Sequence, residues 1–596
     1  SRLSLLAAQL PRAFPSPLAY LVGNSAGSPE GMGRDLLQGH LCRAAVCWAI
    51  LSASWQAPGW HSAPSLCRGG VRQPVAFIAG RQALLRGQQP QPKVRQQARI
   101  DEFGDPAVAH LISTLNRSPS APALVGELES AMASPVFCEI HMRTVFSRLA
   151  KVEDSITAKV RESRQLNALI ETTGQLMQSG SADGRTVANI FWSTAALRSR
   201  VPQMQRLIPP LIDIIVFRAG EIDPQGIANI IWACAKMRLQ RPQLEQVIPV
   251  LTNMAIDRAD ALSPQQVANI IWAGATLRRD APALLGAMPV MEEMVSELVD
   301  DMNSQHISNV LWSCATLQDA SPELLGAVPV VADRLASIVE SMDAQGVSNI
   351  IWATATLRKR PAALIHALPS LLARALIVSK RLTEQGVSNI IWGIATLASE
   401  TPSLSAELPP MLEVASMMRN RLEARQLALI VWSAGSTQLR DATTLGAVRD
   451  LMTTATSRLG GYQPRDLANM CWGLALSSAA EKGVMKALAA EVACRAPTMN
   501  DKAADLDLPQ IACAFARLDM RHRKMLAAIA SRISPLLQRL NPWGLCALAW
   551  SYANLDSDGQ FSDFQQRLRA EVQRRRIPPA KVESSKFGPA AWRRGR

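Results

Sequence analysis

Acidic side chains are almost absent from the first 100 residues, where only Glu30 and Asp35 stand against eleven Lys and Arg. The segment is rich in Arg, Ala, Ser, Gln and Pro and shows no sustained helical period, a composition typical of an organellar targeting segment. Within it, Ala44–Trp55 is an apolar run too short for a membrane span of about 20 residues. We interpret this run either as the core of a signal peptide ahead of a transit peptide or as a stray patch in a poorly ordered tail.

The motifs of common enzyme and metal chemistry are also missing. The sequence contains no glycine-rich phosphate loop, no GxSxG and no HExxH, and its seven His are scattered. Its ten Cys form no CxxC pair and no Cys/His cluster with zinc spacing. We therefore predict no enzyme, no metal and no cofactor, and we expect the Cys in apolar runs to be buried free thiols.

The net charge of +14 is unevenly distributed. Residues 1–100 contribute +9 and residues 561–596 contribute +7, which leaves −2 for residues 101–560. A basic total usually indicates a nucleic acid or an anionic membrane as partner. Here the central region would need its cations sorted onto one face to bind either.

Aromatic residues are few, and 14 of the 28 are Trp. The sequence around eight of these Trp recurs every 40 residues, for example as VANIIWAGATL and VSNIIWATATL. Repetition at this period predicts an all-α, right-handed superhelical α-solenoid of about 40-residue helix-pair repeats, because each pair has an apolar face that only stacking can bury. Eight of the Trp are each 40 residues from the next: Trp192, Trp232, Trp272, Trp312, Trp352, Trp392, Trp432 and Trp472.

Each repeat, numbered one to eight by these Trp, is expected to contain two helices. The first begins at a capping signal such as Ser263-Pro264, and small residues beside Trp272 would allow neighbouring helices to approach closely. A Pro ten residues after most Trp opens the second segment, and another, such as Pro289, follows seven residues later. That second Pro predicts either a kink or a turn followed by a new helix, and we favour the kink.

The register weakens at both ends, which suggests five segments. These are a targeting or disordered basic segment (1–100), degenerate helical repeats (101–180), eight regular repeats (181–480), degenerate repeats (481–560) and a basic tail (561–596). Phe515 and Trp550 stand at the Trp position of two degenerate repeats. Atypical terminal repeats are what a solenoid needs as caps.

Asn precedes Trp by three residues in seven repeats, which places the two side chains on one helix face. They could contact RNA bases, or they could be structural, with Trp filling the joint between repeats and Asn bonding a neighbouring backbone group. We favour the structural interpretation, because an invariant residue cannot distinguish one base from another. The series is Asn189, Asn229, Asn269, Asn309, Asn349, Asn389 and Asn469.

Base readout would instead require polar positions that vary between repeats, and such positions lie six and seven residues before Trp. The alternative is an exposed helix N-terminus with no partner. The candidate readout residues are Thr186, Gln225, Gln265, Gln266, Gln305, His306, Gln345, Gln385, Arg425, Gln426, Arg465 and Asp466.

Six residues after Trp, a row of cations could follow a phosphate backbone or could simply be solvated near helix C-termini. These candidate phosphate contacts are Arg198, Arg238, Arg278 and Arg358.

The motif ANIIWAxATL, followed by Pro and a second apolar helix, resembles the octotricopeptide repeat family and the similar heptatricopeptide proteins of apicomplexans and algae. The likeness is strong over residues 181–480, although the repeat here is 40 rather than 38 residues and no RAP domain is evident. It implies a nuclear-encoded protein of the chloroplast, or next the mitochondrion, acting in RNA stability, processing or translation.

The partners that this resemblance implies are single-stranded organellar RNA and other organellar gene-expression proteins. It implies neither a membrane span nor a small-molecule substrate. The alternative function is a protein-interaction scaffold of the HEAT or armadillo kind in an organellar complex. The near-zero charge of residues 101–560 supports that alternative.

Overall fold

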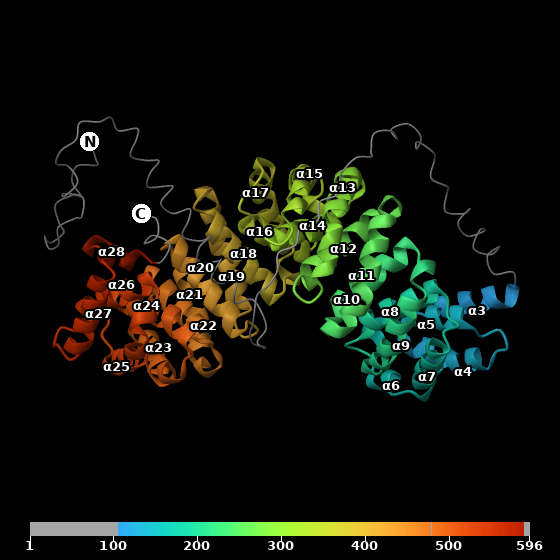
Figure 1. Cartoon of the computed structure of the whole chain (residues 1–596), viewed down its shortest axis with the longest axis horizontal. Coiled ribbons are helices and arrows are strands. Elements are labelled where there is room, and N and C mark those ends of the chain that lie inside the picture. Colours follow the sequence, from blue (N-terminus) through green and yellow to red (C-terminus); the bar gives the residue numbers. More distant parts are fainter. Residues whose placement is uncertain (1–104, 478, 589–596) are drawn as a thin grey trace.

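The computed structural model describes residues 105–477 and 479–588, which form α-helices, short 3-10 helices and turns with no β-strand among them (Figure 1). Consecutive helix pairs stack in sequence order along the described chain, and the predicted all-α solenoid is confirmed. None of the helices in this part of the chain is both long and apolar enough to cross a membrane. The predicted targeting segment, with Ala44–Trp55, lies outside the described residues.

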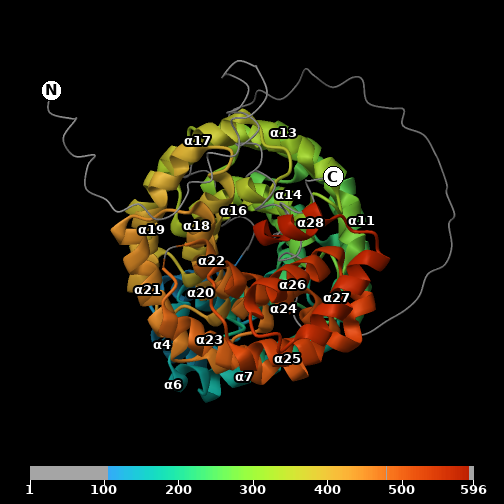
Figure 2. The ribbon, with the colours of Figure 1, turned by 90° about the vertical axis from the view of Figure 1, so that its left-hand side faces the viewer.

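One helix of each repeat carries the Trp and lies on the inside of the superhelix (Figure 2). Each inner helix packs against the inner helix of the next repeat, which buries the apolar residues that alternate with the Trp face. The inner helices are α8 (Gly184–Leu197), α10 (Pro224–Met237), α12 (Pro264–Leu277), α14 (Ser304–Leu317), α16 (Ala344–Thr356), α18 (Glu384–Leu397), α20 (Ala424–Thr437), α22 (Pro464–Leu476), α24 (Asp501–Arg517) and α26 (Pro542–Leu555).

The second helix of each repeat lies on the outside of the superhelix (Figure 2). The outer helices are α9 (Ile208–Phe217), α11 (Arg241–Asp257), α13 (Met288–Leu298), α15 (Ala327–Leu335), α17 (Ala362–Ile377), α19 (Leu408–Met417), α21 (Ala442–Thr456), α23 (Lys482–Arg495), α25 (Arg523–Ile533) and α27 (Ser562–Arg574).

The prediction of kinked second segments is wrong for four of the six repeats that have the second Pro. In repeats one, three, four and six a 3-10 helix precedes a new α-helix, and the Pro lies in the first turn of that helix. A Pro in the first turn has no intrahelical hydrogen bond to lose, so starting a new helix costs less than kinking an old one. Only Pro249 in α11 and Pro369 in α17 lie inside one continuous helix.

Both ends of the described chain are helical. The N-terminal helices are α3 (Pro106–Arg117), α4 (Ala121–Ala133), α5 (Glu139–Lys151), α6 (Ala158–Arg161) and α7 (Arg164–Gln178), and α3 and α5 extend the inner row to α8. At the other end, the described part of the predicted basic tail is folded instead. Its helix α27 buries Phe564, Leu568 and Val572. The helical spacing of these apolar residues was not recognised in the sequence because Arg residues lie among them.

Arginine side chains join consecutive repeats. Arg258 at the end of α11 donates to the carbonyl oxygens of Ile222 and Gly220, which lie one repeat earlier, and Arg374 donates to Met342 in the same way. The charged guanidinium thereby satisfies carbonyl groups in the turns that precede the inner helices. Arg218, Arg458, Arg495, Arg532 and Arg575 make equivalent bonds. Sequence reasoning missed this series, because only Arg218, Arg258 and Arg458 keep the same distance from Trp.

Candidate functional site

The inner helices of repeats two to five present one uniform polar and aromatic stripe. It consists of the residues seven and three positions before Trp together with the Trp itself, and this spacing lies along one helix face. The Gln side chains are exposed, and the Asn and Trp side chains are half-buried. We call this stripe the inner track: Gln225, Asn229, Trp232, Gln265, Asn269, Trp272, Gln305, Asn309, Trp312, Gln345, Asn349 and Trp352.

The Trp rings of neighbouring repeats pack against each other. Ring centroids are 6.3 Å apart for Trp192–Trp232, 6.4 Å for Trp232–Trp272 and 6.3 Å for Trp312–Trp352, with interplanar angles of 31° to 35°. A base inserted between two rings would need two stacking gaps of about 3.4 Å each, which exceeds this spacing. The rings therefore fill the joint between repeats and offer only their exposed edges to a ligand.

The Asn row does not form the expected ladder between repeats. The amide of Asn189 donates within its own helix to the Arg185 carbonyl at 2.8 Å, and Asn389 accepts from Gln385 at 2.8 Å. Within the described part of the chain, the side chains of Asn229, Asn269 and Asn309 have no hydrogen-bond partner, and neither has that of Asn349. Four amide groups of the inner track are thus free to bind a ligand.

The residues six positions before Trp are turned toward their own helix ends. The Gln266 side chain accepts from the Ser263 backbone N–H at 2.9 Å, and Gln426 accepts from Glu423 at 2.8 Å. The ring Nδ1 of His306 and the carboxylate of Asp466 accept from their N-cap residues in the same manner. In the other four repeats, the residue six positions before Trp donates its backbone N–H to a side-chain oxygen of the N-cap residue. Thr186, which is fully buried, is one of these donors. The variation between repeats at this position therefore follows helix capping, not base readout.

The row seven positions before Trp divides in two. In repeats two to five its Gln side chains are exposed, whereas in repeats six to eight Gln385, Arg425 and Arg465 make contacts within the chain. Gln385 bonds Asn389, and Arg465 forms an ion pair of 2.9 Å with Asp507 of α24. Burial lowers the pKa of Arg425, which lies near the carboxylate of Asp466. Of the twelve candidate readout residues, the structure leaves Gln225, Gln265, Gln305 and Gln345 open to a ligand.

Asp507 gives the C-terminal repeats a pH dependence. Burial raises the pKa of this carboxyl to about 6, in spite of the opposing attraction of Arg465. The folded state therefore holds the proton more tightly than the unfolded state, and ionisation between about pH 4 and pH 6 lowers the free energy of unfolding. We expect Asp507→Asn to gain stability relative to the wild type by about 2 kcal/mol over that window. Urea denaturation at both pH values measures this, and an unchanged difference would contradict it.

The four candidate phosphate contacts lie at the C-terminal ends of inner helices and differ in what they bind. Arg198 donates to the Met237 carbonyl of the next repeat and Arg278 to the Ala275 carbonyl of its own helix. Arg358 is exposed and pairs with Asp319 of the preceding repeat. Arg238 alone of the four is exposed with a guanidinium that has no hydrogen bond or ion pair within the described chain, so it keeps its charge for solvent or a ligand.

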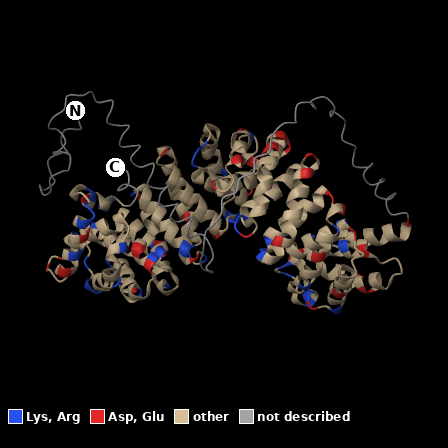
Figure 3. Ribbon diagram, viewed as in Figure 1, with Lys and Arg blue, Asp and Glu red and all other residues tan. Residues whose placement is uncertain are grey.

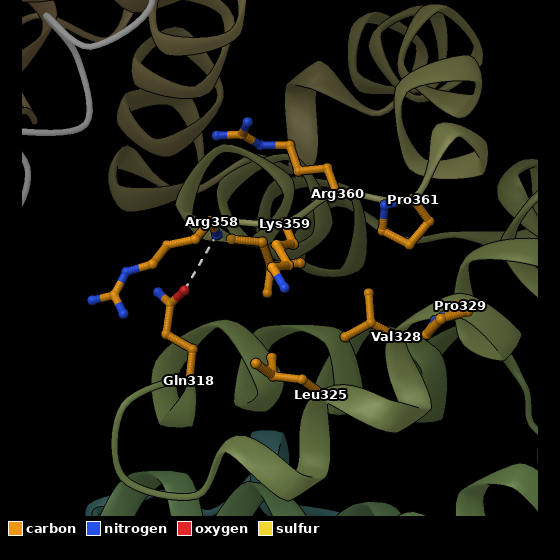
Figure 4. Close-up of a pocket in the computed structure, with 9 residues that line it drawn as sticks. Gln318, Leu325, Val328, Pro329, Arg358, Lys359, Arg360 and Pro361 are labelled. Atoms are coloured by element: carbon orange, nitrogen blue, oxygen red, sulfur yellow. Dashed lines mark hydrogen bonds between the residues drawn. The ribbon is translucent and has the colours of Figure 1, made fainter.

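A cavity of about 470 Å³ opens between repeats four and five, where α16 ends one residue earlier than its neighbours (Figure 4). Leu325, Val328 and Pro329 form its apolar floor, and the side chain of Lys359 points toward that floor (Figure 4). Such a site suits a flat apolar group that carries an anionic substituent.

Charge is sparse on the inner track. The solvent-facing residues of α12, α14 and α16 are uncharged, and Lys236, 5.8 Å from the Trp232 ring centroid, is the one cation facing solvent on α10. Figure 3 shows Lys, Arg, Asp and Glu mainly at helix ends and in turns of the described chain. Exposed Arg279 and Lys359 at the C-terminal ends of inner helices add positive charge along one edge. The inner face is thus polar, aromatic and nearly neutral, with cations along one rim.

The His, Cys, Asp and Glu residues of the described chain are dispersed, and several of its thiols are buried. No group of three His, Cys, Asp or Glu in it could hold a metal ion. Burial raises the pKa of the Cys234, Cys314, Cys471 and Cys513 thiols to about 12, so these groups stay protonated and inert. They are free thiols in the core, as expected from the sequence.

A stack of helix pairs whose inner face repeats one polar stripe defines a helical-repeat protein with an extended binding surface. Residues 156–442, just under half of the chain, match the sequence model of a family described as RNA-editing substrate-binding complex 6 protein. That span contains the whole inner track. This match does not test the resemblance to the octotricopeptide repeat family, which stays a prediction.

Other comparisons add little. No curated protein matches the chain. One matching solved structure is described as a homology model of the full-length AP-3 complex in an intermediate open conformation. It is 11% identical, covers 84% of this chain and 90% of that chain, and has a TM-score of 0.24. With so low a TM-score, it carries no argument about this protein.

Proposed function

We propose that this protein binds single-stranded RNA on its inner track and acts in organellar post-transcriptional gene expression, in the chloroplast first and the mitochondrion next. Its task would be RNA stability, processing or translation, by binding rather than by catalysis. The observation that carries the proposal is the row of exposed Gln and unbonded Asn amides beside the Trp edges in four successive repeats. Support comes from the match to a family named for binding RNA-editing substrates.

The chemistry of the inner track suits single-stranded RNA. An amide side chain has both donors and an acceptor, which fit base edges and 2′-hydroxyl groups, and a Trp edge adds apolar contact. The step of 6.3 to 6.4 Å between Trp rings is nearly twice the spacing of about 3.4 Å between stacked bases. One nucleotide per repeat therefore requires an unstacked strand, whose phosphates could reach the rim cations Arg238, Arg279 and Lys359.

The track also limits selectivity. Gln, Asn and Trp are the same in all four repeats, so these side chains cannot tell one base from another. We therefore propose that base preference arises outside this stripe, for example at the cavity beside Lys359, where one nucleotide could differ from its neighbours.

Charge reversal on the exposed Gln row tests the proposal. We expect Gln225→Glu/Gln265→Glu/Gln305→Glu/Gln345→Glu to weaken RNA binding by about 100-fold, because four carboxylates would face the phosphates. The fold should survive, since these residues are exposed in first helical turns, where negative charge is favourable. Fluorescence anisotropy with labelled single-stranded RNA measures the affinity, and thermal unfolding checks the fold.

The matched control adds the same four charges elsewhere. Gln205, Gln246, Gln538 and Gln573 are exposed on outer segments, and their substitution by Glu should change RNA affinity by no more than about twofold. Equal losses for the two quadruple variants would mean that net charge rather than the inner track governs binding. If the wild type itself binds no RNA at low salt, the proposal is wrong.

A protein-interaction scaffold is the second candidate, and one observation favours it. Ile377 and Met417 end the outer helices of consecutive repeats with exposed fractions of 73% and 76%. Apolar side chains in register on an outer surface suit a protein partner. Crosslinking in an organellar extract separates the two functions, because RNA recovered on α10–α16 supports the first and a protein recovered on α17–α19 supports the second.

A further inference from the structure

The last described residues fold back onto the inside of the solenoid. Helix α28 (Pro579–Ser584) and the 3-10 helix η15 (Ser585–Phe587) pack on the inner helix α26, and Figure 2 shows α28 on the inner side of α26 and α27. We call residues 579–588 the terminal strap. From α26 its contacts run backward along the chain, first to α24 and then to α22, so that it spans three repeats of the inner face.

The strap is held through its main-chain oxygens. The indole Nε1 of Trp543 donates to the Ser585 carbonyl at 3.2 Å, and the thiol of Cys513 lies 3.9 Å from the same oxygen. Arg517 donates to the Lys586 carbonyl at 2.8 Å. The inner face thus supplies an aromatic and a cationic hydrogen-bond donor, and the backbone carbonyl groups of the strap point toward them and accept.

The tip of the strap covers a Trp of the repeat series. A Cβ atom at Gly588, whose φ is +91°, would lie 3.0 Å from Cζ2 of Trp472. The guanidinium of Arg517 lies 5.6 Å from the centroid of the same ring. Trp472 is 6% exposed, and Trp392 and Trp432, which lie outside the reach of the strap, are buried as well, at 2% and 4%.

Two of the residues that contact the strap stand at register positions that form the inner track in repeats two to five. Trp472 occupies the Trp position of repeat eight, and Trp543 stands seven residues before Trp550, as Gln225 stands before Trp232. Aromatic rings and a guanidinium are the groups that bind bases and phosphates of a single strand. Within the strap, α28 contains no buried residue, whereas Ser585 of η15 is fully buried.

We infer that the inner faces of α22, α24 and α26 are a further RNA-binding segment, and that the terminal strap and single-stranded RNA compete for it. The inference rests on the proposed function and adds three repeats, which repeats six and seven separate from the inner track. With the strap in place, RNA occupies only the open repeats. With the strap displaced, Trp472, Arg517 and Trp543 contact about three more nucleotides, one for each repeat.

The test loosens the strap in the full-length chain. Gly588→Val cannot keep the positive φ or the contact with Trp472, so it detaches the tip. Gly483→Val is the matched control, because a Cβ at Gly483 meets no atom within 4 Å. A chain ending at Ile577 removes the strap altogether. Binding is measured against uridine oligomers of increasing length, with thermal unfolding as the check on the fold.

We expect Gly588→Val and the shortened chain to need about five more nucleotides for full affinity, three for the uncovered repeats and two to span repeats six and seven, and to bind long RNA about tenfold more tightly than the wild type. Gly483→Val should behave as the wild type. Unchanged length dependence and affinity in a folded Gly588→Val chain would overturn the inference and leave the proposed function standing. Binding only after loosening would support competition by the strap but contradict RNA binding on the inner track, and no binding by any chain would overturn both.

Discussion

Gly473→Ala is expected to lower the free energy of unfolding by about 3 kcal/mol or more. The inner helices α20 and α22 meet through backbone atoms at Gly435 and Gly473. A Cβ at Gly473 would lie 2.5 Å from the Val431 carbonyl oxygen and 2.8 Å from Cα of Trp432, and no side-chain rotation can relieve a clash with backbone. The two helices would have to separate, which opens the core on both sides of the contact.

The control for this substitution is Gly446→Ala in the outer helix α21. A Cβ there meets no atom within 4 Å, so we expect a gain of about 0.5 to 1 kcal/mol from the better helix propensity of Ala. Urea denaturation followed by circular dichroism measures both variants. If Gly473→Ala were as stable as Gly446→Ala, the close approach of α20 and α22 would not be a constraint on the fold.

Arg495→Met is expected to destabilise the protein by about 2 to 4 kcal/mol and to uncouple repeat seven from repeat eight. Arg495 donates to the carbonyls of Tyr462, Gly460 and, at 3.1 Å, Leu459. Met keeps the apolar stem but none of the donors, so these carbonyls lose a charged partner. Because a solenoid is stable only through contacts between neighbours, the loss should appear as a broader unfolding transition or as two transitions.

Two control variants separate the causes. Arg440→Met removes an exposed charge from the turn after α20 and should change the free energy of unfolding by about 0.5 kcal/mol or less. Glu491→Gln removes only the ion-pair partner of Arg495, which is partly exposed, and should cost less than Arg495→Met. A single sharp transition of Arg495→Met with wild-type stability would show that the arginine bonds do not join the repeats.

The repeat architecture could be predicted because its causes are local. A Trp every 40 residues, apolar residues at helical spacing and N-cap signals such as Ser263-Pro264 each act within one helix or between neighbours in the stack. The same locality explains the small residues beside the Trp, which do mark close approach at Gly435 and Gly473. The second Pro misled the prediction, since a kink and a new helix look alike in sequence and differ only in where the helix begins.

The candidate site was predicted only in part. The row seven positions before Trp contains the exposed Gln of the inner track, while the row six positions before Trp serves helix capping through residues such as Gln266 and Asp466. The sequence contained the information for this distinction, because a capping box has a recognisable pair of residues at the N-cap and at the third position of the helix. The sequence could not show that the amides of Asn229 and its counterparts are free, because a hydrogen-bond partner in another repeat depends on the distance between helices.

The sequence by itself determined the class of fold, the repeat length and the helix that carries the Trp. Tertiary structure decided which side chains face the inside, that arginine rather than asparagine joins the repeats, and that residues 579–588 return to cover Trp472. The physical reason is the range of the interactions. Helix periodicity and capping are written in neighbouring residues, whereas the partner of a guanidinium, an amide or a ring is set by packing between segments that are distant in the chain.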